Sequence, residues 1–253
     1  MPDIDHEHQQ NLPRFKRTRQ QLEHVARHRA TANLIRSLWK AASPSQRKDN
    51  DFLVLLVKLG WNNRSKGKGF ESTQEWRNEQ LAEYLGVQGA AGDYVAQRLG
   101  VEFPSFKKRA QHLIQQRTGM THYYPASRPA TLEFVRRHRQ VIGAAFDEVS
   151  QGGTENRIGS VTEQILGLGR IKTPWGSTVS PLKGFTPAMA CLDPRERFPV
   201  MNNPTRPLLR ALGQTEDSDG AVALYSLIRS RGLGIKYSLE LDVYAFTQMV
   251  KAP

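Results

Sequence analysis

The stretch from Val179 to Gly213 constrains the fold of this chain most, because two helix starts and a tight turn follow one another within it. We predict a short apolar helix over residues 187–192, entered through a turn at residues 183–185. A second helix should open at Asn202, since asparagine is a favoured N-cap, and Pro204 suits the first turn because it has no N–H to lose. The stretch therefore predicts two helices joined by a loop, the second of them capped by Asn202.

These residues resemble the helix-hairpin-helix superfamily of DNA glycosylases, in which a turn of the form L-P-G-V-G-x-x-T-A precedes an apolar run ending in V-D-T-H-V. Residues 183–190 (KGFTPAMA) are similar to the turn, and residues 198–203 (FPVMNN) are similar to the approach to the catalytic aspartate. The resemblance covers residues 157–246. It implies a multi-helical, all-α fold and removal of a damaged or modified base from duplex DNA.

Three positions depart from the family pattern. Thr186 replaces the second hairpin glycine, which weakens the expected contact between backbone and phosphate. Ala188 stands where bifunctional members carry a Schiff-base lysine, so lyase chemistry is not expected. Asn202 stands at the aspartate position, with Asn203 as the next candidate. The resemblance therefore implies at most a monofunctional enzyme with a rebuilt site.

Cleavage of an N-glycosidic bond needs negative charge near the sugar, and the amide of Asn202 supplies only a dipole. Losing such a preorganised contact costs about 2.7–4 kcal/mol, a factor of about 10²–10³ in rate. Either the protein binds DNA without cleaving the bond, or Asn202 positions a water and an acid such as Asp193, Glu196 or Asp242 supplies the charge. We take Asn202, Asn203 and Asp193 as the catalytic candidates, with an ordinary N-cap as the alternative for Asn202.

The charge of the chain favours a polyanionic partner. It has 36 lysines and arginines against 24 aspartates and glutamates, a net charge of +12. Such a chain repels itself unless a polyanion is near, and nucleic acid is the commonest one. Duplex DNA is the expected partner, ahead of RNA, and the alternative to an enzyme is a non-catalytic nucleic-acid-binding subunit that has protein partners in a repair, restriction or defence assembly.

Candidate DNA contacts fall in three places. The loop at residues 61–70 interleaves basic residues with glycine between two aromatics, as expected of a segment that follows phosphates. One turn of a helix at residues 130–149 carries several arginines, for which a solvated face is the alternative. The hairpin and the second helix supply the rest. The candidates are Arg64, Lys66, Lys68, Arg136, Arg137, Arg139, Lys183, Gly184, Thr186 and Arg206.

Short helical patterns joined by glycine and proline, without convincing alternating strands, predict an all-α fold. Further helices are expected at residues 20–42 and at 51–59, the latter ended by Gly60. We divide the chain into a flexible basic arm at 1–20, a helical part at 21–150 and a helix-hairpin-helix-like part at 151–253.

Other classes are disfavoured by composition. One cysteine, Cys191, excludes an internal disulfide and a multi-cysteine metal site, and the seven histidines are scattered, so no metal or cofactor is expected. No apolar run approaches the roughly 20 residues of a membrane span, and the first residues lack a secretory signal. We therefore expect a cytoplasmic protein, associated with the nucleoid if bacterial, and no membrane partner.

Overall fold

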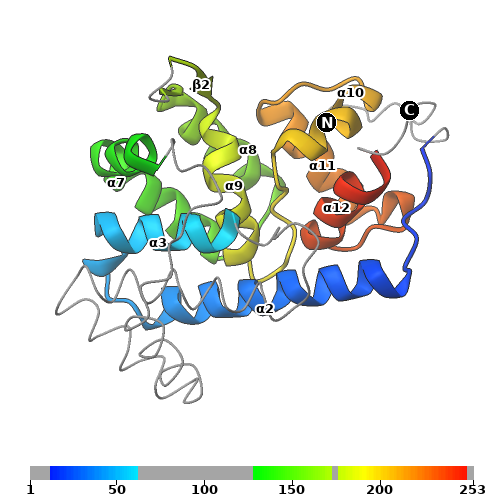
Figure 1. Cartoon of the computed structure of the whole chain (residues 1–253), viewed down its shortest axis with the longest axis horizontal. Coiled ribbons are helices and arrows are strands. Elements are labelled where there is room, and N and C mark those ends of the chain that lie inside the picture. The colour runs from blue at the N-terminus through cyan, green and yellow to red at the C-terminus, as the bar shows by residue number, and fades with distance from the viewer. Residues whose placement is uncertain (1–11, 62–127, 173–175, 250–253) are drawn as a thin grey trace.

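The computed structural model describes residues 12–61, 128–172 and 176–249, and these are mostly helical, which confirms the all-α class. The helices pack against one another, and a two-stranded antiparallel β-hairpin lies at one edge (Figure 1). In chain order the elements are α2 (Arg19–Ala41), η1 (Gln46–Lys48), α3 (Asn50–Trp61), α7 (Arg128–Ser150), α8 (Glu155–Gly167), β1 (Ile171–Lys172), β2 (Thr178–Val179), α9 (Pro181–Leu192), η3 (Asn203–Thr205), α10 (Arg206–Ala211), α11 (Ser218–Arg229), η4 (Gly232–Gly234), α12 (Ser238–Tyr244) and η5 (Ala245–Met249).

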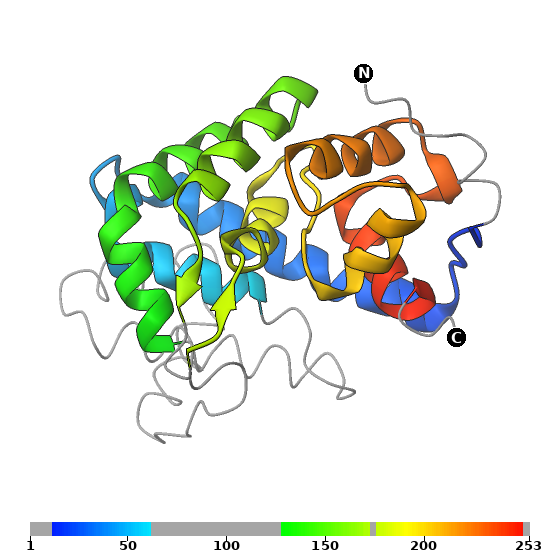
Figure 2. The same ribbon diagram turned by 90° about the horizontal axis from the view of Figure 1, so that it is seen from above.

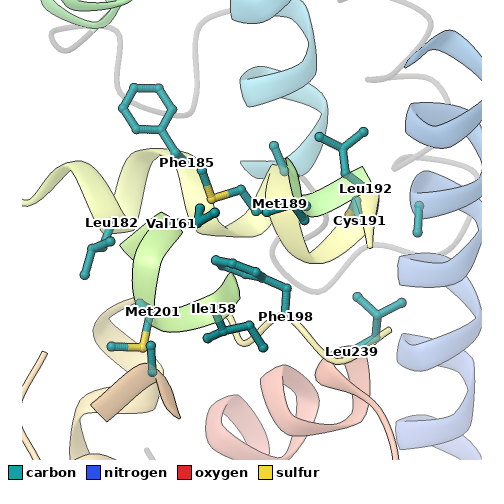
Figure 3. Packing of buried hydrophobic residues seen from close by; sticks show 14 of the residues in the cluster. Ile158, Val161, Leu182, Phe185, Met189, Cys191, Leu192, Phe198, Met201 and Leu239 are labelled. Carbon is teal, nitrogen blue, oxygen red and sulfur yellow. The ribbon is translucent and has the colours of Figure 1, made fainter. Parts of the chain in front are cut away.

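Helix α9 is the centre of the core. Every one of its residues except Lys183 is buried, because α2, α3, α7 and α8 all pack against it. Figure 3 shows this packing, with Met189 of α9 near Val161 of α8 and Phe198 of the following loop. A helix that is apolar on all sides is stable only when it is covered on all sides. The apolar character of α9 thus explains its position.

Helix α3 crosses α9 at close range. The predicted end at Gly60 is wrong, because α3 continues through this glycine to Trp61. A Cβ atom at Gly60 would lie 2.5 Å from the backbone nitrogen of Ala188 and 2.7 Å from its Cα. The glycine therefore permits two helix backbones to approach, which is a packing role instead of a helix stop.

Helix α2 confirms the predicted helix at residues 20–42. It begins with a capping box, in which Thr18 and Gln21 each accept a hydrogen bond from the other residue's backbone N–H. It runs along the lower edge of the described part of the chain in Figure 1, beneath α3 and α12, and also packs on α9. Ile35 and Leu38 are buried there, whereas Leu22 is 47% exposed.

Residues 12–18 are not a free arm in the structure, which corrects the expectation for the described part of this segment. The backbone N–H of Phe15 donates to the carbonyl oxygen of Leu233 at 2.8 Å. The hydroxyl of Tyr244 donates to the carbonyl oxygen of Pro13, also at 2.8 Å. The segment leading into α2 is thus fixed against the C-terminal helices.

One hydrophobic core extends over the described residues, from Phe15 to Met249. The predicted division at residue 151 falls on the short connection between α7 and α8, two helices that pack on each other. Residues on both sides of this connection contribute to the same core. None of the helices in the described ranges is long and apolar enough to cross a membrane.

Candidate functional site

The predicted turn at residues 183–185 is wrong. Helix α9 begins at Pro181, which occupies the first position after the N-cap Ser180, so these residues lie in its first turns. Gly184 is buried inside the helix. Lys183 is the one residue of α9 that is partly exposed. Because a phosphate contact requires access to solvent, Lys183 is the only residue of α9 that could make one.

Thr186 is likewise placed in the interior. Its side chain is fully buried, and its hydroxyl donates to the carbonyl oxygen of Leu182 at 2.7 Å. The same hydroxyl accepts from the backbone N–H of Met201 at 2.8 Å, which joins α9 to the segment before η3. As arranged, neither Gly184 nor Thr186 presents a surface to DNA, because both belong to the core.

Asn202 opens the second helical segment as predicted. Its side-chain oxygen accepts from the backbone N–H of Thr205 at 3.3 Å, and its own N–H donates to the hydroxyl of Thr205 at 2.9 Å. The segment begins as the short 3-10 helix η3, with Pro204 in its first turn, and continues as α10. Asn203 is the first residue of η3 and is exposed.

Asn202 also belongs to a buried polar group. Its amide nitrogen donates to Oδ1 of Asp242 on α12 at 3.1 Å. Oδ2 of Asp242 lies 3.6 Å from Nδ1 of His28 on α2. The three side chains come from three separate segments and are 3% to 4% exposed. The structure therefore selects Asp242, among the three acids considered, as the carboxylate beside Asn202.

Asp193 is used in a different way. It caps the C-terminus of α9 and is fully buried. Oδ1 accepts from the backbone N–H groups of Gly153 and Arg195, and Oδ2 accepts from those of Arg197 and Phe198, all at 2.8–2.9 Å. A carboxylate with four donors is committed to holding its loop, so we do not retain Asp193 as a catalytic candidate.

Glu196 holds the same loop against α2. Its carboxylate lies 3.3 Å from Arg29 and 3.6 Å from Arg36. The guanidinium of Arg29 also stacks on the ring of Tyr237, 4.7 Å from its centroid. Glu196 is therefore bound by two cations of α2 and is not the acid at Asn202.

Two other cations act electrostatically on Lys183, in the first turns of α9. We call Arg170, Lys183 and Arg206 the Lys183 cluster. Burial lowers the pKa of Lys183, Glu216 raises it, and the charges of Arg206 and Arg170 lower it further. Arg170 donates to the hydroxyl of Thr178 across the β-hairpin at 2.8 Å. Two predicted DNA contacts, Lys183 and Arg206, thus act on each other through their charges.

Arg170 and Glu216 were missed by the sequence reasoning. Arg170 follows a glycine before the β-hairpin, and Glu216 lies in an acidic loop. The sequence shows the charge of these two residues, but no motif or spacing links them to Lys183. Arg206 Nε lies 2.8 Å from Glu216 Oε2, which makes Glu216 the acidic neighbour of the cluster. His28 was also missed, because the spacing along α2 does not show that it faces Asp242.

The arginines of α7 are exposed as expected, but two of them share an acid. Arg136 and Arg137 have side chains that are 67% exposed, and both pair with Glu133 one turn earlier, at 2.6 and 3.2 Å. Arg139 is exposed beyond a bend at His138, where the backbone leaves helical geometry (Figure 2). This face of α7 is therefore only partly neutralised.

The remaining predicted contacts, Arg64, Lys66 and Lys68, lie outside the described residues. Within the described ranges, no three histidine, cysteine or acidic residues gather in a way that would hold a metal ion. Comparison with protein families, curated proteins and solved structures gives no match, so the resemblance stays an interpretation of the residues themselves.

Proposed function

We propose that this chain binds duplex DNA and that the Lys183 cluster contacts its phosphates. The observation that carries the proposal is that Lys183 keeps a partly exposed side chain on α9 and that the charges of Arg170 and Arg206, from two other segments, act on it. Crowded cations repel each other, and a phosphate backbone removes that repulsion while counterions are released from the DNA. The net charge of +12 supports the same partner.

Binding without catalysis is the form of this proposal that the geometry favours. Asn202 and Asp242 are almost completely buried and bonded to each other, and Asp193 is occupied by its own loop. A flipped nucleotide needs an open pocket that reaches the reacting groups. The arrangement therefore supports the interpretation as a non-catalytic nucleic-acid-binding subunit.

Base excision is the second candidate, and one observation favours it. Asp242 supplies a carboxylate 3.1 Å from the amide of Asn202, the position at which the glycosylase resemblance has its aspartate. Such a carboxylate would stabilise the positive charge that develops on the sugar as the glycosidic bond breaks. Excision at this place requires η3 or α12 to move, because both side chains are buried.

The binding proposal is tested by fluorescence anisotropy with a labelled duplex over a range of salt concentrations. In the variant with Arg170, Lys183 and Arg206 changed to Gln, the slope of log K against log salt should fall by about 0.9 for each phosphate that is no longer neutralised, about 2.7 for three. Three exposed basic residues elsewhere, Lys40, Lys48 and Arg229 changed to Gln, form the charge-matched control. Equal slopes for the two variants would refute the assignment to the cluster.

The excision candidate is tested by alkali-induced strand breaks in duplexes that carry damaged or modified bases. Breaks made by the wild-type protein and absent with Asp242→Asn and Asn202→Ala would establish a monofunctional glycosylase. Tight binding without breaks would favour the non-catalytic subunit. Thermal unfolding of both variants separates a loss of chemistry from a loss of folding, since both residues are buried.

A further inference from the structure

Glu216 pairs with Arg206 of the Lys183 cluster, but only one of its two carboxylate oxygens has a partner in the described part of the chain. Its Oε2 is 2.8 Å from Nε of Arg206, and its charge raises the pKa of Lys183. Its Oε1 is buried and has no hydrogen-bond partner among the described residues. A buried carboxylate oxygen normally accepts at least one hydrogen bond. The carboxylate of Glu216 therefore pairs with Arg206 through one oxygen and leaves the other without a hydrogen bond to the described residues.

The loop that carries Glu216 is held at both of its ends. At the end of α10, Gly213 has a φ of 67°, and the N–H of Gln214 donates to the carbonyl oxygen of Leu209 at 2.8 Å. At the start of α11, Oδ1 of Asp217 accepts from the N–H of Gly220 at 2.9 Å. The backbone thus delivers Glu216 to one fixed place, and a rotation of its side chain is enough to move the carboxylate.

We propose that the Lys183 cluster is a phosphate-binding site and that the Glu216 carboxylate occupies it in the free protein. The inference rests on the proposed DNA binding and adds an internal competitor to it. A carboxylate and a phosphate both accept hydrogen bonds from a guanidinium, and the phosphate offers more oxygens. Binding then exchanges Glu216 for a phosphate oxygen at Arg206, and the carboxylate turns toward solvent.

An internal competitor has a definite effect on recognition. It lowers the affinity for every single phosphate group, because each must displace Glu216. A duplex loses a smaller share of its affinity than a small anion does, since it presents many phosphates and gains from counterion release at several of them. Glu216 would therefore discriminate against small anions in favour of a continuous phosphate backbone.

A purely structural salt bridge predicts the opposite result. If Glu216 only fixes Arg206 in a binding geometry, then removing its charge weakens both folding and binding. If Glu216 competes with phosphate, then removing its charge strengthens binding. The sign of the change in affinity therefore separates the two roles.

The test is Glu216→Gln, measured by anisotropy with duplex DNA at a fixed salt concentration. We expect the affinity to rise about two- to fivefold, the range that corresponds to loss of one partly exposed ion pair. Glu155→Gln makes the same change in net charge at an acid that faces Arg229 at 3.7 Å, outside the cluster. In an Arg206→Gln background, Glu216→Gln should change the affinity by less than about 1.5-fold, because the shared partner is gone.

Inorganic phosphate is the second probe, and it does not depend on DNA binding. Thermal unfolding in phosphate and in chloride of equal ionic strength should show a larger stabilisation by phosphate for Glu216→Gln than for the wild type. It should be smallest for Arg206→Gln, which keeps only the general stabilisation that phosphate gives any folded protein. If no variant binds DNA, the proposed function fails while this measurement still decides the site. No gain in either assay, or an equal gain for Glu155→Gln, would overturn the inference.

Discussion

Replacement of Asp193 by asparagine tests how strongly one carboxylate holds the loop that joins α9 to η3. The change keeps the shape of the side chain but turns one acceptor oxygen into an NH₂ donor. In the structure, each oxygen accepts two backbone N–H groups, from Gly153 and Arg195 at Oδ1 and from Arg197 and Phe198 at Oδ2. Either orientation of the amide therefore places an NH₂ group opposite two donors.

The cost follows from these four hydrogen bonds. In either orientation one buried and one partly buried backbone N–H group lose their acceptor, and an unsatisfied buried group costs about 1–3 kcal/mol. We therefore expect Asp193→Asn to lower the free energy of unfolding by about 2–6 kcal/mol. The two hydrogen bonds to the remaining oxygen are also weakened, because that oxygen no longer carries a negative charge. Natural domains are stable by about 5–15 kcal/mol, so the variant should lose a large part of its stability.

The assay is equilibrium unfolding in urea, followed by circular dichroism of the helices. Asp219→Asn is the control, because it makes the same chemical change in the first turn of α11, away from this loop. It should cost no more than about 1 kcal/mol through the helix dipole. A loss below about 1 kcal/mol for Asp193→Asn, equal to that of the control, would refute the reasoning that these hydrogen bonds hold the loop.

Two further predictions concern packing and pH. Gly60→Ala should lower the free energy of unfolding by about 1–3 kcal/mol in thermal melts, because the new methyl group would lie 2.5 Å from the backbone of Ala188. Gly167→Ala is the control and should have little effect, because no atom lies within 4 Å of its Cβ position. Burial raises the pKa of the Tyr244 phenol from 10.0 to about 12. The stabilisation that comes from keeping this phenol protonated in the folded protein is complete below pH 10 and is lost as the pH rises through 12. The wild type should therefore lose stability between pH 10 and 12 more steeply than Tyr244→Phe. Urea midpoints that change in parallel for the two proteins would contradict this.

The helices with clear start signals and regular apolar spacing were predictable. Helix α2 begins within one residue of the expected position, since Thr18 and Gln21 form a capping box. Helix α9 was not predicted correctly. When only local preference is considered, Gly184 favours a turn and Pro187 favours the start of a helix. In the folded chain, burial of the surrounding apolar residues on every side outweighs that preference.

The candidate site was predictable only in part, for a different reason. Lys183 and Arg206 stand out by charge and by the resemblance to glycosylases. The neighbours Arg170 and Glu216 come from other segments, and no spacing along the chain shows that they meet. Asp193 was taken for a catalytic acid because the four backbone donors that occupy it become visible only once the loop has folded.

The anchoring of residues 12–18 has a consequence for how the protein is made. Arg17 pairs with Glu240 at 3.2 Å, and the two lie 223 positions apart in the chain. A ribosome adds about 5–20 residues per second, so roughly 10–45 s separate the synthesis of the two partners. During this interval α12 is not there to cover the apolar face of α2, and α9 is synthesised only late in it. The first described helix to leave the ribosome therefore depends on the last ones, and the nascent chain is a natural client for chaperones that shield apolar surface.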